Sequence, residues 1–495
     1  MRHNIAVAAL SALVIGTTAA TTACGSSSSG DSSSKTITVA YQKFGTFIQM
    51  DQHMQKIKAE YEKAHPGYTV KLNPIEASEN DYYTKLTLMN RSPKSAPDVM
   101  YEDTFLVNTD IQAGFLAPLD DYLKDWADWS QFTDAAKTAA KAQDGKTYGV
   151  PMGTDTRALW YNKDLFKQAG LTVPWEPKSW NDILTAARTI KAKLPGVTPL
   201  NVYSGKAAGE ASTMQGFEML LYGTKNTLYD DASKKWVTSS PGFTDSLNFI
   251  KTIFSEKLGP APQDALDPNW GTKLSTELLP SNKLAIDLDG SWLNGTWIST
   301  GSKPWPQWST VLGTAAMPTQ NGEAPGKTSM SGGWVLSVGS HAKDKKAAFD
   351  LVAQALNKEN SLAYDIAASQ IAERKDVAAD QRYLSSNPTL KFFTDLVEIT
   401  HFRPAYPVYP RISNEIQVAM ESVMTGQASP DQAAKTFADQ VKRRTSIPAA
   451  SLFSRIACCS RILSSKRIPT RSMVCTHWRF PSRPITIGNM PNRHC

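Results

Sequence analysis

The feature that most constrains the fold is an alternation of strand-like and helix-like segments early in the chain. Residues 36–41 (TITVAY) and 68–75 (YTVKLNPI) are rich in β-branched and aromatic side chains, which is typical of strands. Residues 51–63 between them carry apolar side chains at helical spacing, residues 81–89 predict a second helix, and residues 97–101 predict a third strand. This order predicts a parallel sheet with helices on both faces, and therefore an α/β fold.

A second series of similar segments follows. Ser179 is placed to cap a helix, residues 283–288 and 332–338 read as strands, and residues 343–356 predict another helix. Ser429 and the following proline are placed to open a final helix. Two such series in a body of about 410 residues predict two lobes, each with its own core.

The beginning of the chain has the pattern of an export signal. A short positive start precedes an apolar run at residues 5–16, which is too short to cross a bilayer about 30 Å thick. We therefore predict a signal peptide over residues 1–23. Cys24 follows small residues and resembles the cysteine of a bacterial lipobox, so we expect it to be lipidated. Residues 24–35 then form a Ser/Gly linker. The alternative is an ordinary secretory signal with an incidental cysteine.

The end of the chain differs in composition from the rest. Residues 445–495 contain seven Arg, one Lys and no acidic residue, and four of the five cysteines. Without these eight positive charges the formal charge of +7 becomes −1, so the body is near neutral and the basic pI indicates no nucleic-acid partner. We interpret this basic, Cys-containing tail as disordered or out of frame; a membrane-touching arm or a metal site are the alternatives.

Several segments together resemble the extracellular solute-binding proteins (family 1 type) of carbohydrate ABC transporters. In chain order they are Pro97–Met100, Gly114–Leu119, Asp144–Pro151, Tyr161–Phe166, Trp180 with its helix, Gly290–Trp292, Gly332–Trp334, Arg403–Pro404 and Tyr409–Ser413. Each segment alone is weakly specific. Their order across residues 36–444 is what carries the resemblance.

The resemblance implies a two-lobed, periplasmic-binding-protein-like (Venus-flytrap) fold, in which each lobe is a mainly parallel sheet flanked by helices. It implies an N-terminal lobe of residues 36–152 and 314–362, and a C-terminal lobe of residues 153–313 and 363–444. Residues 149–153 and 312–318 are the expected hinges, because glycine and proline there can absorb a change of backbone angles.

The same resemblance implies that a sugar binds between the lobes. A sugar offers hydroxyl groups at its edge and C–H groups on its faces, so it needs both polar side chains and flat aromatic rings. Trp334 follows two glycines and Trp292 follows a Gly-Ser turn. We expect both to stack on the ligand, with a place in the lobe core as the alternative for each. Trp160 is expected to serve packing.

Charged contacts are expected at the ends of strands. Asp103 follows the third strand, and Asp155 lies just beyond the first hinge; each is otherwise a solvated surface residue. Arg403 resembles an arginine that reaches the ligand in trehalose- and maltose-type members, and its alternative is a salt bridge between lobe segments. Further expected contacts are Tyr41 and Gln42, which end the first strand, and Glu76, which ends the second.

These interpretations predict binding without catalysis. The chain would be a monomer that captures a di- to trisaccharide, with trehalose or maltose as examples of an α-linked ligand, and delivers it to the permease. It would be anchored at the outer face of the cell membrane and would need no cofactor or metal. The sequence has no GxxxxGK[ST] phosphate loop, so it is not the ATPase subunit. A secreted glycoside hydrolase and a binding protein for a peptide or polyamine are the alternatives.

Overall fold

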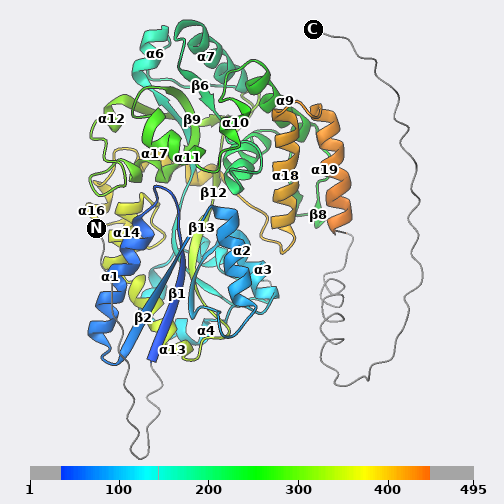
Figure 1. Cartoon of the computed structure of the whole chain (residues 1–495). Helices are drawn as coiled ribbons and strands as arrows, with labels where there is room; N and C mark the ends of the chain where they lie inside the picture. Colours follow the sequence, from blue (N-terminus) through cyan, green and yellow to red (C-terminus); the bar gives the residue numbers. More distant parts are fainter. Residues whose placement is uncertain (1–34, 143, 446–495) are drawn as a thin grey trace, which may run out of the picture.

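Two sheets, each covered by helices, organise the part of the chain that the computed structural model describes, residues 35–142 and 144–445 (Figure 1). The predicted signal peptide, Cys24, almost all of the linker and residues 446–495 of the tail lie outside the described residues. Among the described helices, none combines the length and the apolar character needed to cross a membrane.

The first sheet has the strand order β2-β1-β3-β13-β4. Strands β2, β1 and β3 are parallel to one another, whereas β13 runs antiparallel to both of its neighbours. The elements of this lobe are β1 (Lys35–Lys43), α1 (Gln49–Ala64), β2 (Tyr68–Glu76), α2 (Glu79–Asn90), β3 (Val99–Asp103), α3 (Thr104–Gln112), α4 (Asp120–Leu123), a 3-10 turn (Ala127–Gln131), α5 (Asp134–Ala139), β4 (Gly149–Thr154), β13 (Gly333–Val338), α13 (Lys345–Ala355) and α14 (Lys358–Ala368). The five elements predicted between residues 36 and 101 are all present.

The second sheet has the order β10-β5-β9-β6. Only β6 and β9 are parallel neighbours, because β5 enters directly from the first lobe and runs antiparallel to both β9 and β10. The elements are β5 (Arg157–Asn162), α6 (Lys163–Ala169), α7 (Trp180–Lys193), β6 (Thr198–Asn201), a π-helical segment η2 (Ser212–Glu218), α8 (Met219–Leu221), the hairpin β7 (Tyr229–Asp230) and β8 (Lys235–Trp236), α9 (Pro241–Ser255), α10 (Pro262–Ala265), α11 (Trp270–Lys273), a second π-helical segment η3 (Leu274–Leu278), β9 (Leu284–Gly290), a 3-10 segment η4 (Ser291–Thr296), α12 (Trp308–Val311) and β10 (Leu312–Ala315).

The remaining segments connect the lobes or cover the second one. A small third sheet has the order β11-β12-β14, and α18 and α19 pack as a pair beside the second lobe (Figure 1). Their bounds are β11 (Met317–Pro318), β12 (Lys327–Ser331), α15 (Lys375–Ala378), α16 (Gln381–Leu384), α17 (Leu390–Asp395), a 3-10 turn (Leu396–Ile399), β14 (Thr400–Phe402), α18 (Tyr409–Met424) and α19 (Pro430–Thr445).

Two of the predicted helix starts have the expected caps. The Ser179 side chain accepts a hydrogen bond from the backbone N–H of Asp182, whose carboxylate in turn accepts one from the backbone of Ser179. The Ser429 hydroxyl accepts one from the backbone of Gln432 at the start of α19. Both helices thus begin where side-chain oxygens satisfy N–H groups that the helix leaves free.

The chain passes between the lobes at three adjacent places: after β4, between β12 and β13, and after α14. Thr154 and Ile371 exchange two backbone hydrogen bonds of 3.0 and 2.8 Å, which join the first and third crossings. The Thr154 hydroxyl donates to the carbonyl of Gly332 at 2.7 Å, which joins the first and second. These bonds hold the three crossings together as one narrow connection.

The lobe boundaries differ from the predicted ones at two points. Residues 312–318, expected as a hinge, are hydrogen-bonded strands: β10 pairs with β5 of the second sheet and β11 pairs with β12. The return to the first lobe therefore comes at Gly332, between the end of β12 and the start of β13. The first-lobe helix α14 continues to Ala368, beyond the predicted limit at 362, because Tyr364 and Ala368 are buried in the first core.

Candidate functional site

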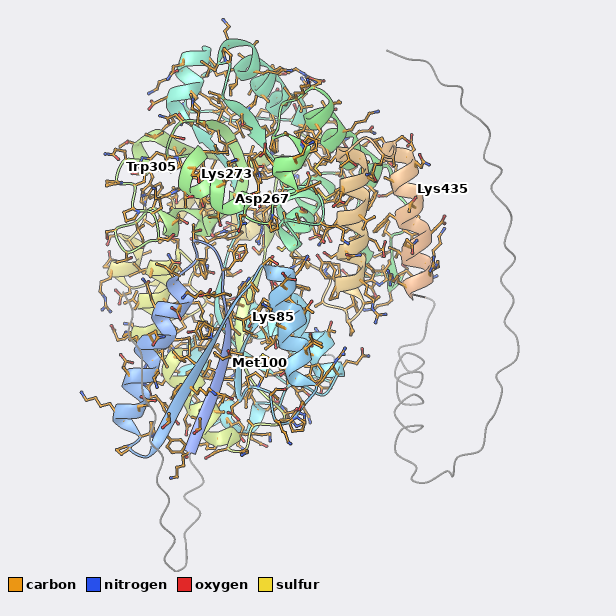
Figure 2. All side chains as sticks on the ribbon, in the orientation of Figure 1. Lys85, Met100, Asp267, Lys273, Trp305 and Lys435 are labelled. Atoms are coloured by element: carbon orange, nitrogen blue, oxygen red, sulfur yellow. The ribbon has the colours of Figure 1, made fainter. Side chains whose placement is uncertain are left out.

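A pocket of about 230 Å³ lies between the two lobes, at the ends of β1, β3, β5 and β9. Strand ends facing a crevice are where α/β proteins place ligands. Figure 2 shows all side chains on the ribbon and labels Asp267, which lines the pocket from the second lobe. The aromatic side chains that line the pocket are Phe44, Phe47, Tyr101, Tyr203, Trp270, Trp292 and Trp334. The charged ones are Glu79, Asp103, Asp155, Arg157, Glu210, Asp267, Asp289 and Arg403.

Trp334 lines the pocket and is also packed into the first lobe. Its ring stacks on Tyr101 with centroids 4.2 Å apart and an angle of 8° between the planes. Tyr82 and Tyr83 lie against it at 6.3 and 6.1 Å. Trp334 thus lines the pocket and also packs against the first-lobe core, which is the alternative considered for it.

Trp292 is placed by the glycine two residues before it. A Cβ on Gly290 would lie only 1.9 Å from Cζ3 of the indole, so the ring occupies space that any other residue at 290 would fill. The guanidinium carbon of Arg157 lies 4.7 Å from the ring centroid, which is a cation–π contact. Trp292 is partly exposed and lines the pocket.

Asp103, Arg403 and Glu210 form a buried charge network across the pocket floor. Arg403 donates to both carboxylate oxygens of Asp103, at 2.5 and 3.3 Å, and its Nη1 lies 3.6 Å from Oε1 of Glu210. The three side chains are 4 to 5% exposed. Asp103 belongs to the first lobe and Glu210 to the second. The salt bridge considered as the alternative for Arg403 is thus present, and the residue also lines the pocket.

Asp155 and Arg157 form a second network at the crossings. The Arg157 guanidinium donates to Asp155, to Gln215 at 3.3 Å and to the carbonyl of Met330 at 3.1 Å. The backbone N–H of Gly332 donates to Asp155 at 2.8 Å. A Cβ on Gly332 would lie 3.3 Å from Nη2 of Arg403 and 3.5 Å from Nη2 of Arg157, so both networks meet at this crossing.

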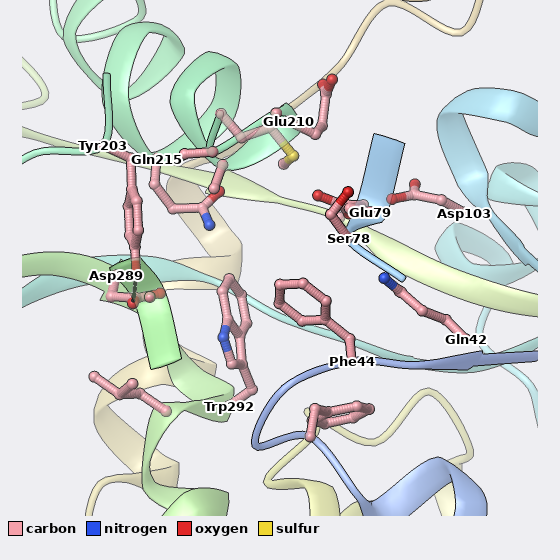
Figure 3. A pocket seen from close by; sticks show the side chains of 18 of the residues that line it. Gln42, Phe44, Ser78, Glu79, Asp103, Tyr203, Glu210, Gln215, Asp289 and Trp292 are labelled. Carbon is pink, nitrogen blue, oxygen red and sulfur yellow. Dashed lines mark hydrogen bonds between the residues drawn. The ribbon is translucent and has the colours of Figure 1, made fainter. Parts of the chain in front are cut away.

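Glu79 and Asp289 are pocket carboxyl groups held by tyrosine hydroxyls. The Tyr83 hydroxyl lies 2.8 Å from Oε1 of Glu79, and the Tyr203 hydroxyl donates to Asp289 at 2.9 Å (Figure 3). Burial, together with the nearby negative charge of Asp103, raises the pKa of Glu79 to about 7. Burial also raises the pKa of Asp289. Within residues 35–142 and 144–445, neither group forms a salt bridge with a Lys or Arg.

Three predicted contacts at strand ends have different outcomes. Gln42 lines the pocket, and its amide donates to the carbonyl of Ala77 at 3.3 Å. Tyr41 does not line it: its side chain points to the opposite face of the sheet, where it is fully buried and its hydroxyl donates to Asp51. Glu76 is also outside the pocket, because it ends the edge strand β2 in solvent, 3.3 Å from Nζ of Lys43.

Trp160 is confirmed as a packing residue. It is fully buried among Trp297, Trp308 and Phe393 in the second lobe.

Several pocket residues were not predicted. Glu79 begins helix α2, Glu210 precedes η2, and Arg157 begins β5. Phe44 lies in the loop after β1. Asp289 directly precedes the Gly-Ser-Trp segment, so its position at a strand end was a usable signal. Phe44, Glu79 and Glu210 carry no local pattern that separates them from other surface residues.

The lining combines hydrogen-bond acceptors, guanidinium donors and aromatic faces. Carboxylates form strong charge-assisted hydrogen bonds with hydroxyl groups, and indole or phenyl rings cover C–H faces. In the described part of the chain, no three His, Cys, Asp or Glu side chains are grouped so that they could hold a metal ion. The arrangement suits a hydroxyl-rich molecule with apolar faces.

Comparison with known proteins agrees with the fold. A binding protein of Brucella abortus (strain 2308) is 25% identical over 386 residues, which is 78% of this chain and 88% of that protein. The galactooligosaccharide-binding protein of Bacillus subtilis (strain 168) is 24% identical over 396 residues, 78% and 86% of the two chains. The GacH receptor of Streptomyces glaucescens, solved without ligand and with acarbose, is 25% identical with a TM-score of 0.70, over 83% and 98% of the chains.

A family model also covers most of the two lobes. The model described as bacterial extracellular solute-binding protein matches residues 46–361. This span contains the pocket residues from Phe47 to Trp334. The chain therefore belongs to the bacterial extracellular solute-binding protein family.

Proposed function

We propose that this protein is the substrate-binding component of an ABC importer for a di- to trisaccharide. The sugar would enter the open cleft, contact both lobes and favour the closed form by its higher affinity for that form. The closed protein would then deliver the sugar unchanged to the permease. Lipidation of Cys24 would keep the protein at the outer face of the membrane.

The observation that carries the proposal is the chemistry of the interlobe pocket. Trp292 and Trp334 supply aromatic faces, and Glu79 and Asp289 are carboxyl acceptors without a cationic partner among the described residues. A sugar needs both kinds of contact. The oligosaccharide and acarbose ligands named for two similar proteins point to the same class of solute.

An α-linked disaccharide such as trehalose or maltose is the narrower part of the proposal. It rests on the resemblance of the Arg403 segment to trehalose- and maltose-type members. Arg403 lines the pocket while it is held between Asp103 and Glu210. Its remaining N–H groups would be free to donate to a sugar hydroxyl.

Calorimetric titration of the full chain tests the function. The panel is trehalose, maltose, maltotriose, cellobiose and xylobiose, with spermidine and a tripeptide as non-sugar controls. We expect at least one sugar to bind with a micromolar Kd, which corresponds to about −8 kcal/mol. Binding of spermidine or the tripeptide alone would contradict the sugar proposal.

Incubation of the same sugars with the protein separates binding from hydrolysis. We expect chromatography to recover each sugar unchanged after a long incubation. Release of monosaccharides would instead support the glycoside hydrolase alternative, which needs two carboxyl groups acting together at the scissile bond.

A further inference from the structure

Phe44 is the most exposed of the described aromatic rings that line the pocket, with 37% of its surface accessible. Exposing a phenyl ring to water is unfavourable, and this ring is exposed at the wall of the pocket, where a ligand could cover it. Phe44 comes from the first lobe, in the loop between β1 and α1.

This loop is held in place from both lobes. The backbone N–H of Phe47 donates to the carbonyl of Phe44 at 2.8 Å, which closes a tight turn. Gly45 within the turn has a φ of +47°, and a Cβ there would lie 2.5 Å from Oγ1 of Thr272 in the second lobe. Gln49, just after the turn, donates from Nε2 to the carbonyl of Gly295 in the second lobe at 2.8 Å. The position of Phe44 is thus fixed when the two lobes are together.

Trp292 lines the same pocket from the second lobe. In Figure 3 the Phe44 side chain extends toward the Trp292 indole, which comes from a ribbon segment of the other lobe. Arg157 covers Trp292 by its cation–π contact, and Tyr101 stacks on Trp334. Protein side chains therefore already cover one aromatic face of each tryptophan. Phe44 adds a further aromatic surface that is exposed in the pocket.

We propose that Phe44 and Trp292 form a two-sided aromatic clamp that holds one ring of the bound sugar by its C–H faces. The inference rests on the proposed function and adds a specificity-determining residue to it. Because the two rings belong to different lobes, the clamp is complete only in the closed form. Phe44 thus contributes to the difference in affinity between closed and open forms that drives closure.

The test measures maltotriose, maltose and trehalose binding to the full chain and to Phe44→Ala. Loss of one stacking surface is expected to raise the Kd about 5- to 150-fold, on the scale of alanine substitutions at base-stacking rings. The increase should appear mainly in the dissociation rate, measured by stopped-flow tryptophan fluorescence, because the clamp acts after closure. Phe44→Tyr, which keeps the ring, should bind nearly as the parent does.

Leu384→Ala is the matched control. Leu384 is an exposed apolar residue on α16, with 50% of its surface accessible, and it does not line the pocket. Its substitution should leave the Kd unchanged. Phe44→Leu serves as a second variant, since it keeps an apolar side chain in the turn but removes the flat ring, and it should also weaken binding.

The outcomes separate this inference from the proposed function. If the parent binds none of the three sugars, the proposed function fails for them and the clamp fails with it. If the parent binds one and folded Phe44→Ala and Phe44→Leu bind it as tightly as Leu384→Ala does, the clamp is refuted and the proposed function stands. Weaker binding with an unchanged dissociation rate would also overturn the clamp.

Discussion

Replacing Arg403 with Met tests the buried charge network most directly. Arg403, Asp103 and Glu210 are each 4 to 5% exposed in their side chains, so removing the cation leaves two carboxyl groups buried without it. Breaking a buried ion pair by removing one partner costs about 3–5 kcal/mol of unfolding free energy.

The structure places this substitution near the lower end of that range. Glu210 also accepts hydrogen bonds from Tyr409 at 2.7 Å and Ser413 at 2.6 Å. Asp103 also accepts from the backbone of Phe105 at 3.2 Å. These donors remain in Arg403→Met, so we expect a loss of about 3 kcal/mol in urea unfolding at pH 8.

The loss should depend on pH with a definite sign. Burial raises the pKa of Glu210, whereas the charge of Arg403 lowers it, so removing Arg403 raises this pKa further. A carboxyl group with a raised folded-state pKa takes up a proton on folding. It contributes stability below its unfolded pKa, near 4.3, and loses that contribution as the pH rises toward the folded pKa. The difference between parent and Arg403→Met should therefore grow from pH 5 to pH 8.

Urea unfolding followed by tryptophan fluorescence at several pH values measures this difference. Arg403→Met combined with Asp103→Asn and Glu210→Gln removes all three charges and should recover much of the lost stability, because no carboxylate is then left unpaired. If Arg403→Met alone is as stable as the parent at pH 8, the network does not stabilise the fold as argued.

Three further predictions concern the pocket. Trp334→Ala should lower the unfolding free energy by about 3–5 kcal/mol, because its ring stacks on Tyr101 in the core. Trp292→Ala should mainly weaken sugar binding, by about 1–3 kcal/mol. These roles are misassigned if urea unfolding shows the larger loss of stability for Trp292→Ala and calorimetry shows the larger loss of affinity for Trp334→Ala. Gly290→Ala should displace the Trp292 indole, which a Cβ would meet at 1.9 Å, and reduce sugar affinity in a folded protein; unchanged affinity would count against that platform. Sugar affinity should rise as the pH increases through about 7, because Glu79 becomes a charged acceptor there, and Glu79→Gln should remove this rise; the same pH profile in both proteins would rule out Glu79 as its source.

Much of the first lobe could be predicted because its elements are local and strongly patterned. Residues 36–101 contain three segments patterned as strands and two patterned as helices, and these appear as β1, α1, β2, α2 and β3. Asp103 reaches the pocket because the carboxyl ends of parallel strands face the same crevice. A position at the end of a strand thus correctly predicted a pocket residue where the strand is central in the sheet.

The same guide failed where burial or sheet position mattered. Tyr41 and Gln42 are consecutive, so their side chains lie on opposite faces of β1, and only Gln42 reaches the pocket. Glu76 ends β2, which is the edge strand and lies away from the crevice. The sequence pattern does not indicate which face or which edge of the first sheet lies toward the other lobe.

The contacts that could not be predicted join distant parts of the chain. Arg403 meets Asp103 at a separation of 300 residues, and Glu210 joins them from the second lobe. The position of the second crossing at Gly332 likewise depends on how β11 and β12 pair, which short strands do not reveal. These features follow from tertiary packing and have no local signal.

A crystal structure of the full chain with the tightest-binding sugar of the panel tests the central claim most directly. We expect intact sugar between the lobes, with one ring against Trp292 and hydroxyl groups hydrogen-bonded to Glu79 or Asp289. Sugar bound elsewhere on the surface, or a cleaved sugar in the pocket, would contradict the account.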